Sequence, residues 1–215
     1  MFNDRSTVRR LTLTVAAGAG ALTLLAACGG SDTGTHSPSG HSGAQSSAAA
    51  SPSTSAPAAA FNEADVMFAQ MMIPHHRQAV EMADLAATRA SDKEVKDLAA
   101  KIKAAQDPEI VTLTGWLTSW GKPVPAEGDA GGHGAHGGMP GMMTPEDLAK
   151  LAAAKGTAFD KLFAEQMIAH HNGAIEMART EVAQGANPEA KALAATIGST
   201  QQTEVDQLKK ILDRL

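Results

Sequence analysis

Two histidine pairs with methionines around them are the residues of this 215-residue sequence best suited to bind a ligand. On a helix with about 100° per residue, His75 and His170 would each share a face with several of these methionines. Imidazole nitrogen and thioether sulfur suit soft cations such as Cu(I), whereas magnesium and calcium prefer oxygen. We therefore expect copper, as Cu(I), to be the ligand. The expected metal ligands in the two stretches are Met71, Met72, His75, His76, Met82, Met167, His170, His171 and Met177.

The two stretches belong to an internal duplication. Shifting the chain by 95 residues aligns Asp65–Leu113 with Asp160–Leu208 without a gap, and 20 of the 49 positions are identical. Such a repeat indicates two copies of one supersecondary unit. Both copies carry the histidine pair, which is why we interpret the pairs as functional.

The second half of each copy places polar residues where apolar ones are expected. Gln106 and Glu109 interrupt the apolar stripe of one helix, and Gln201 and Glu204 interrupt the other. If each hairpin turns midway, these residues lie level with the histidines. A buried carboxylate is costly without a partner. We therefore expect Glu109 to orient His75, and Glu204 to orient His170, as neighbours of the metal ligands.

The composition and the capping signals predict an all-α fold. Aromatic residues make up only 3% of the chain and tyrosine is absent, which disfavours a β-sandwich or barrel. Helix starts are predicted near Asn62, at Ser91 with Glu94 as a capping box, at Thr144–Pro145 and at Asn187–Pro188. Four amphipathic helices of about 25 residues or more would form a four-helix bundle over residues 61–215.

A segment rich in glycine, histidine and methionine joins the two copies. It covers residues 121–143, a length that fits either a plain loop or a crossover along the bundle. We expect it to bind metal separately and more weakly than the bundle, because binding must order a mobile chain. Its expected ligands are His133, His136, Met139, Met142 and Met143.

The N-terminal region is typical of an exported lipoprotein. Residues 1–27 have a positive start and an uncharged stretch, as in a signal peptide, with Sec and twin-arginine export both open. Leu25–Cys28 matches a lipobox, which makes Cys28 the expected lipidation site and the membrane a partner. Residues 28–60 are rich in Ser, Gly, Ala and Pro and are predicted to be a disordered tether. The net charge of −5 argues against nucleic acid as a partner.

The motifs resemble the domain of unknown function 305 family. Its pattern Met-x-x-His-His-x-x-Ala-[Val/Ile]-x-Met-Ala is present at Met72–Ala83 and again at Met167–Ala178. The resemblance implies a ferritin-like four-helix domain, often exported, with some copper-binding members that use methionine and histidine. It implies no established reaction.

Three functions remain open at this point. The first is a lipid-anchored, extracytoplasmic copper-binding protein that sequesters the ion or hands it to a copper-handling partner, without catalysis. The second is a ferritin-like oxidase, although no Glu-x-x-His pair occurs in either copy. The third is a metal-free interaction module of the cell envelope.

Overall fold

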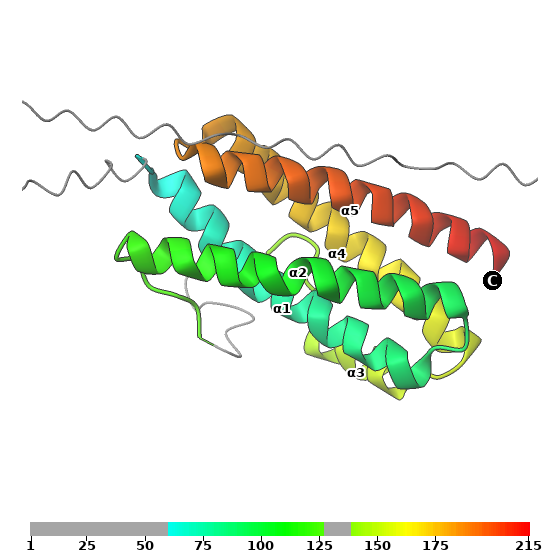
Figure 1. The fold of residues 1–215 in the computed structure, drawn as a ribbon. Helices are drawn as coiled ribbons and strands as arrows, with labels where there is room; N and C mark the ends of the chain where they lie inside the picture. Colours follow the sequence, from blue (N-terminus) through cyan, green and yellow to red (C-terminus); the bar gives the residue numbers. More distant parts are fainter. Residues whose placement is uncertain (1–59, 127–138) are drawn as a thin grey trace, which may run out of the picture. The chain divides into compact units, whose positions relative to one another are not determined.

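The described part of the chain is entirely helical. The computed structural model describes residues 60–126 and 139–215, and these form helices without any strand (Figure 1). The predicted signal peptide, Cys28, the tether up to residue 59, His133 and His136 lie outside the described residues. The helices are α1 (Glu63–Arg89), α2 (Lys93–Ser119), α3 (Pro145–Ala153), α4 (Thr157–Gln184) and α5 (Pro188–Arg214).

Most helix starts follow the predicted capping residues. Asn62 caps α1 in a capping box with Asp65, and Asn187 caps α5 ahead of Pro188. The second start differs by one residue, because Asp92 and not Ser91 accepts the first backbone N–H groups of α2. Ser91 instead donates to Asp160 from both its backbone and its hydroxyl group.

The prediction of one long third helix is wrong, because the structure has two helices, α3 and α4, in its place. Thr144 caps α3 as expected, but α3 has only nine residues and a turn separates it from α4. Gly156 in that turn has a φ of 62°, a conformation that favours glycine. Its N–H group donates to the carbonyl of Arg89 at 2.8 Å, which fixes the turn to the end of α1.

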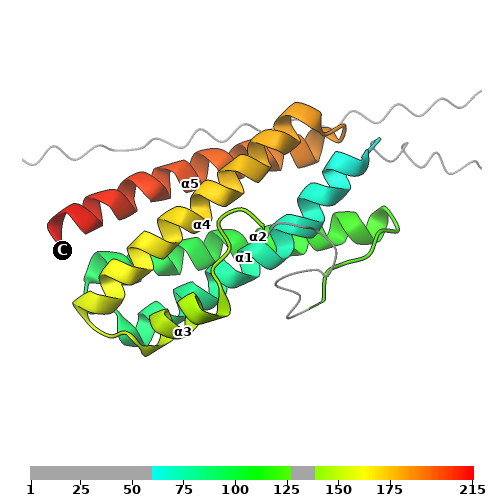
Figure 2. The same ribbon diagram turned by 180° about the vertical axis from the view of Figure 1, so that it is seen from behind.

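The four long helices form a bundle with a crossover. Helix α1 packs against α2 and α4, and α4 packs against α5 (Figures 1 and 2). Asp160 near the start of α4 accepts from Ser91 after the end of α1, so α1 and α4 are antiparallel. The connection from α2 to α4 must therefore run the length of the bundle, which resolves the choice left open by the sequence. Helix α3 forms part of this connection and contacts α1 and α4.

Equivalent aspartates of the two copies hold the copies together. Asp65 accepts hydrogen bonds from the backbone N–H groups of Ala186 and Asn187 at the start of α5. Asp160, its counterpart 95 residues later, does the same for Ser91 and Asp92 at the start of α2. Both carboxylates are fully buried. Each copy thus caps the second helix of the other copy.

The apolar core is split into two clusters by a polar layer. Along each long helix, the members of one cluster end before the central polar residues and the members of the other begin after them. The first cluster contains Ala79, Met82, Val95, Leu98, Ile102, Phe159, Phe163, Met167 and Leu208. The second contains Phe68, Met72, Ile73, Leu113, Leu117, Ala174, Met177 and Ile197.

A buried histidine layer as candidate metal centre

The polar layer contains both histidine pairs. All four histidines have no exposed surface, and the two glutamines are 2% and 3% exposed. Helices α1, α2, α4 and α5 each contribute two residues. The duplication therefore places the same set of side chains on both sides of the bundle. We call this set the histidine layer, and its members are His75, His76, Gln106, Glu109, His170, His171, Gln201 and Glu204.

His75 and His170 meet at the interface of the two copies. Their ring centroids are 3.7 Å apart, with the planes inclined by 41°. The Nε2 atom of His75 lies 3.1 Å from the carbonyl oxygen of Pro140, so Nε2–H donates and Nδ1 keeps its lone pair. The Nδ1 atom of His75 and both ring nitrogens of His170 have no hydrogen-bond partner among the described residues.

The two glutamates orient the other histidine of each pair. The Nε2 atom of His76 lies 2.8 Å from Glu109 Oε2, and that of His171 lies 2.7 Å from Glu204 Oε2. The expectation that these carboxylates orient His75 and His170 is therefore wrong. Successive helix residues point about 100° apart, so one histidine faces the hairpin partner and the other faces the second copy. Glu109 on α2 and Glu204 on α5 bond only to the histidine that faces the hairpin partner, which is His76 or His171.

Many polar atoms of the histidine layer have no partner among the described residues. They are the Nδ1 atoms of all four histidines, Nε2 of His170, Nε2 and Oε1 of Gln106, and Oε1 of Gln201. A buried polar group without a hydrogen bond costs about 1–3 kcal/mol. Such a concentration in the middle of a core leaves a place where water or a bound ion can supply the missing partners.

Burial keeps the central pair of imidazoles neutral. It lowers the pKa of His75 to about 3, with a further contribution from the charge of His76. The pKa of His170 is also held well below its ordinary value by burial and by neighbouring His75. A neutral imidazole offers a lone pair for coordination. The pair can therefore accept a cation at neutral pH without first losing a proton.

The methionines predicted as ligands in the two helical stretches fall into two environments. Met72, Met82 and Met167 are fully buried in the apolar clusters, and Met177 is 7% exposed. Met72 and Met167 are equivalent positions, each three residues before the central histidine of its copy. Met71 is partly exposed and lines a surface pocket. Met67 lines the same pocket and was not among the predicted ligands.

The described end of the linker packs on the histidine layer. We call Met139–Met143 the strap. Gln78 holds it by accepting from the N–H group of Met143 and donating to the Met143 carbonyl. Gly141 has a φ of 78°, and a Cβ atom there would lie 2.6 Å from the carbonyl oxygen of Ala169. A Cβ atom on Gly173 would clash with the carbonyl of the strap's proline. These glycines let the strap approach closely enough to bond the imidazole beneath it.

The central imidazoles are a pair and not part of a larger cluster of charged ligands. Within residues 60–126 and 139–215, no three His, Cys, Asp or Glu side chains are grouped so as to hold a metal ion.

None of the helices in the described part of the chain is both long and apolar enough to cross a membrane.

The fold and the histidine layer define a four-helix bundle built from a duplicated helical hairpin, with a buried centre of imidazoles. The chain belongs to the family described as Domain of unknown function (DUF305), whose pattern matches residues 65–212. The resemblance seen in the sequence and the ferritin-like bundle are thereby confirmed. No curated protein matches the chain.

Solved structures show the same fold, and one of the similar proteins, CopM, was solved with copper bound. A putative secreted DUF305 protein from Streptomyces coelicolor has a TM-score of 0.64 and 32% identity, over 70% of this chain and 93% of that chain. CopM in its Cu(II)-bound form has a TM-score of 0.60 and 36% identity, over 70% and 96%. CopM in its Cu(I)-bound form has a TM-score of 0.58 and 33% identity, with the same coverage.

Proposed function

We propose that this protein binds Cu(I) in the histidine layer and sequesters the ion or hands it on. The observation that supports this most strongly is the contact between His75 and His170. Two neutral imidazoles lie side by side in the core, and three of their four ring nitrogens lack a partner among the described residues. The copper-bound and silver-bound forms of CopM, a protein of similar fold, support the same choice of metal.

The donor set favours a soft monovalent ion over zinc. Zinc usually has four ligands in a tetrahedral arrangement. The protein supplies all four in structural zinc sites, and three in catalytic sites, where water is the fourth. A pair of imidazoles flanked by thioethers suits Cu(I), which accepts sulfur ligands. Met72 and Met167 are the thioethers closest in sequence to the pair. Glu109 and Glu204 fix the orientation of the adjacent histidines.

The arrangement of the carboxylates favours binding over catalysis. A ferritin-like oxidase holds two metals through carboxylates on facing helices and Glu-x-x-His pairs. Here the two glutamates of the layer each accept from a histidine of their own copy. We therefore propose a copper-binding role without a redox reaction on a substrate, and a copper-handling protein as the recipient.

A competition titration tests this function. We expect wild-type full-length protein to bind Cu(I) more tightly than Zn(II) at pH 7.5. The double variant His75→Ala/His170→Ala should lose the tightest copper site and keep its helical circular dichroism. The matched control His133→Ala/His136→Ala removes two linker histidines and should lose only weaker binding. Zinc winning in the wild type, or full affinity in the first variant, would contradict the proposal.

We also propose that the protein acts outside the cytoplasm, attached to the membrane through lipid on Cys28. The related protein described as secreted supports the extracytoplasmic location. Cys28→Ala should move the protein from the membrane fraction to the soluble fraction, because the lipid would be its anchor. Fractionation of cells that express each form, with a salt wash, checks this. A Cys28→Ala protein that stays with the membrane after the wash would contradict the anchor.

A further inference from the structure

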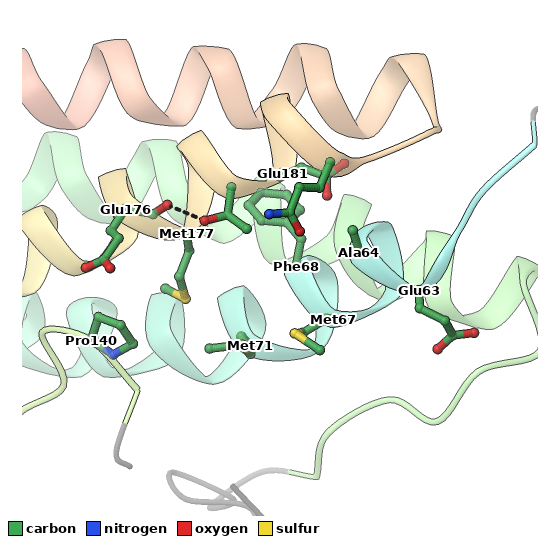
Figure 3. Close-up of a pocket in the computed structure, with 11 residues that line it drawn as sticks. Glu63, Ala64, Met67, Phe68, Met71, Pro140, Glu176, Met177 and Glu181 are labelled. Carbon is green, nitrogen blue, oxygen red and sulfur yellow. Dashed lines mark hydrogen bonds between the residues drawn. The ribbon is translucent and has the colours of Figure 1, made fainter. Parts of the chain in front are cut away.

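A pocket opens beside the histidine layer on the face where α1 and α4 meet. Its volume is about 430 Å³, and Figure 3 shows its lining residues. Three methionines line it, two from α1 and one from α4, together with Phe68 and Pro140. In Figure 3, Met177 extends from α4 toward α1, where Met67 and Met71 lie. Three thioethers from two helices thus border one cavity.

One face of α1 carries three possible ligands of a soft cation, and their exposure to solvent decreases along the helix. Met67, Met71 and His75 are spaced by four residues, so they lie on one face of the helix about 6 Å apart along its axis. Met67 is 59% exposed, Met71 is partly exposed and His75 is fully buried. Soft ligands therefore lead from solvent to the buried imidazole.

The pocket also borders the strap that covers the histidine layer. Pro140 lines the pocket and accepts the hydrogen bond from His75 Nε2. One residue thus separates the cavity from the central imidazole. An ion in the pocket would be next to the layer without yet being enclosed by it.

The charge around the pocket favours a cation. Glu63 and Glu176 line it, and none of the described residues that line it is basic. Burial and neighbouring Asp65 raise the pKa of Glu181, a third lining carboxyl group, to about 8, so that group is largely neutral at pH 7 and adds little charge. Lys122 lies 3.0 Å from the carboxylate of Glu63, whereas Glu176 is exposed and forms no salt bridge among the described residues. A cavity bordered by thioethers and a surface carboxylate suits a soft cation better than an anion.

We propose that Met67, Met71 and Met177 form a second, outer site for a soft monovalent cation, Cu(I) or Ag(I), from which the histidine layer is loaded. The outer site stands on the pocket itself, and the loading step rests on the proposed function of the layer. Thioethers carry no proton to lose, and as neutral ligands near solvent they can release the ion again. The buried imidazole pair is the tighter site that receives the ion.

The test uses Ag(I) with full-length protein carrying ¹³C-methyl methionine. Methyl signals of Met67, Met71 and Met177 should shift on titration, and they should still shift in His75→Ala/His170→Ala. Met67→Leu/Met71→Leu keeps the apolar volume but removes two thioethers. In that variant the Met177 signal should no longer shift. Val111→Leu, a change at an exposed apolar residue of α2 that does not line the pocket, is the matched control and should behave as the wild type.

Loading of the core is measured separately by stopped flow with Cu(I). Losing the outer site should slow loading of the histidine layer by about tenfold or more while leaving its equilibrium affinity unchanged, because the outer site raises the local ion concentration. Unshifted Met67 and Met71 methyl signals while the core loads would overturn the outer site and leave the proposed function intact. Unchanged loading in Met67→Leu/Met71→Leu would overturn the loading step. Shifted methyl signals without any core binding would support the outer site and refute the proposed function.

Discussion

His75 and His170 show how burial prepares two ordinary side chains for the metal binding that we propose. Burial removes water from both rings and lowers the pKa of His75 to about 3. The strap accepts one N–H group of His75, which leaves its other nitrogen as a base. A free imidazole in water would compete with protons near pH 6.5, whereas this pair does so only in stronger acid.

A prediction at the residue scale concerns acid. Coordinating imidazoles must be neutral. The pKa of His75 is lowered to about 3, and that of His170 is also held well below its ordinary value. The Cu(I) affinity of the tightest site should therefore persist as the pH falls through the ordinary range of histidine, and decline only toward the pKa of His75. Competition titrations in buffers that do not bind copper measure it. A decline centred near the ordinary pKa of about 6.5 would show that exposed histidines are the ligands.

The sequence predicted the members of the histidine layer but not their pairing. Repetition of the histidines and of the interrupting Gln and Glu residues was sufficient to find all eight positions. Which histidine faces which helix depends on the rotation of α1 and α4 within the bundle. The sequence indicates how far along the bundle each residue lies, but it does not indicate how each helix is rotated about its axis. For this reason the sequence favours Glu109 as the partner of His75, whereas in the structure it bonds to His76.

At the scale of the elements, hydrogen bonds between the two copies explain why each copy has an aspartate at the equivalent position, Asp65 in the first and Asp160 in the second. Each carboxylate is buried and accepts from two or more backbone N–H groups at the start of a helix in the other copy. The repeat marked both residues as identical, but a role across copies could not be predicted without the α1–α4 contact. Local capping signals did find Asn62 and Asn187, because those bonds are made within a few residues.

A prediction at this scale concerns stability. Asp160→Ala should destabilise the bundle by about 2–5 kcal/mol, because it leaves the backbone N–H groups of Ser91 and Asp92 and the Ser91 hydroxyl group without their carboxylate acceptor. Asp84→Ala is the matched control, since Asp84 is exposed and makes a 3.4 Å surface bridge to Lys103 worth about 0–1 kcal/mol. Urea unfolding of both variants measures the difference. Equal stabilities would contradict a structural role for the caps.

The break between α3 and α4 was not predicted because its signal is weak in the sequence. Gly156 follows alanines and a lysine, without a proline or a second glycine beside it. The turn gains its stability from a tertiary bond to Arg89 at the end of α1. Helical propensity over a single stretch cannot show such a contact.

At the scale of the whole molecule, the crossover covers the centre of the bundle. A plain loop would join helices at one end and leave the centre uncovered. The crossover instead brings the strap against α1 and α4 at the level of the histidine layer. The length of the linker is compatible with both paths, so only the antiparallel arrangement of α1 and α4 could decide between them.

The two apolar clusters place the histidine layer midway along the bundle. Each cluster contributes two methionines, Met82 and Met167 in one and Met72 and Met177 in the other. This symmetry follows from the duplication and could be anticipated from the 95-residue shift. The duplication therefore builds the histidine layer from two equivalent halves, one from each copy.

His75 and His170 are proposed to coordinate the ion together, and copper-edge X-ray absorption of full-length protein with one equivalent of Cu(I) tests this most directly. We predict nitrogen scatterers with the outer-shell pattern of imidazole. That pattern should persist in His133→Ala/His136→Ala, which removes the linker histidines, and should disappear when His75→Ala/His170→Ala is added to that variant. A wild-type spectrum with sulfur ligands alone, or an imidazole pattern that the added His75→Ala/His170→Ala leaves unchanged, would contradict joint coordination by the two histidines.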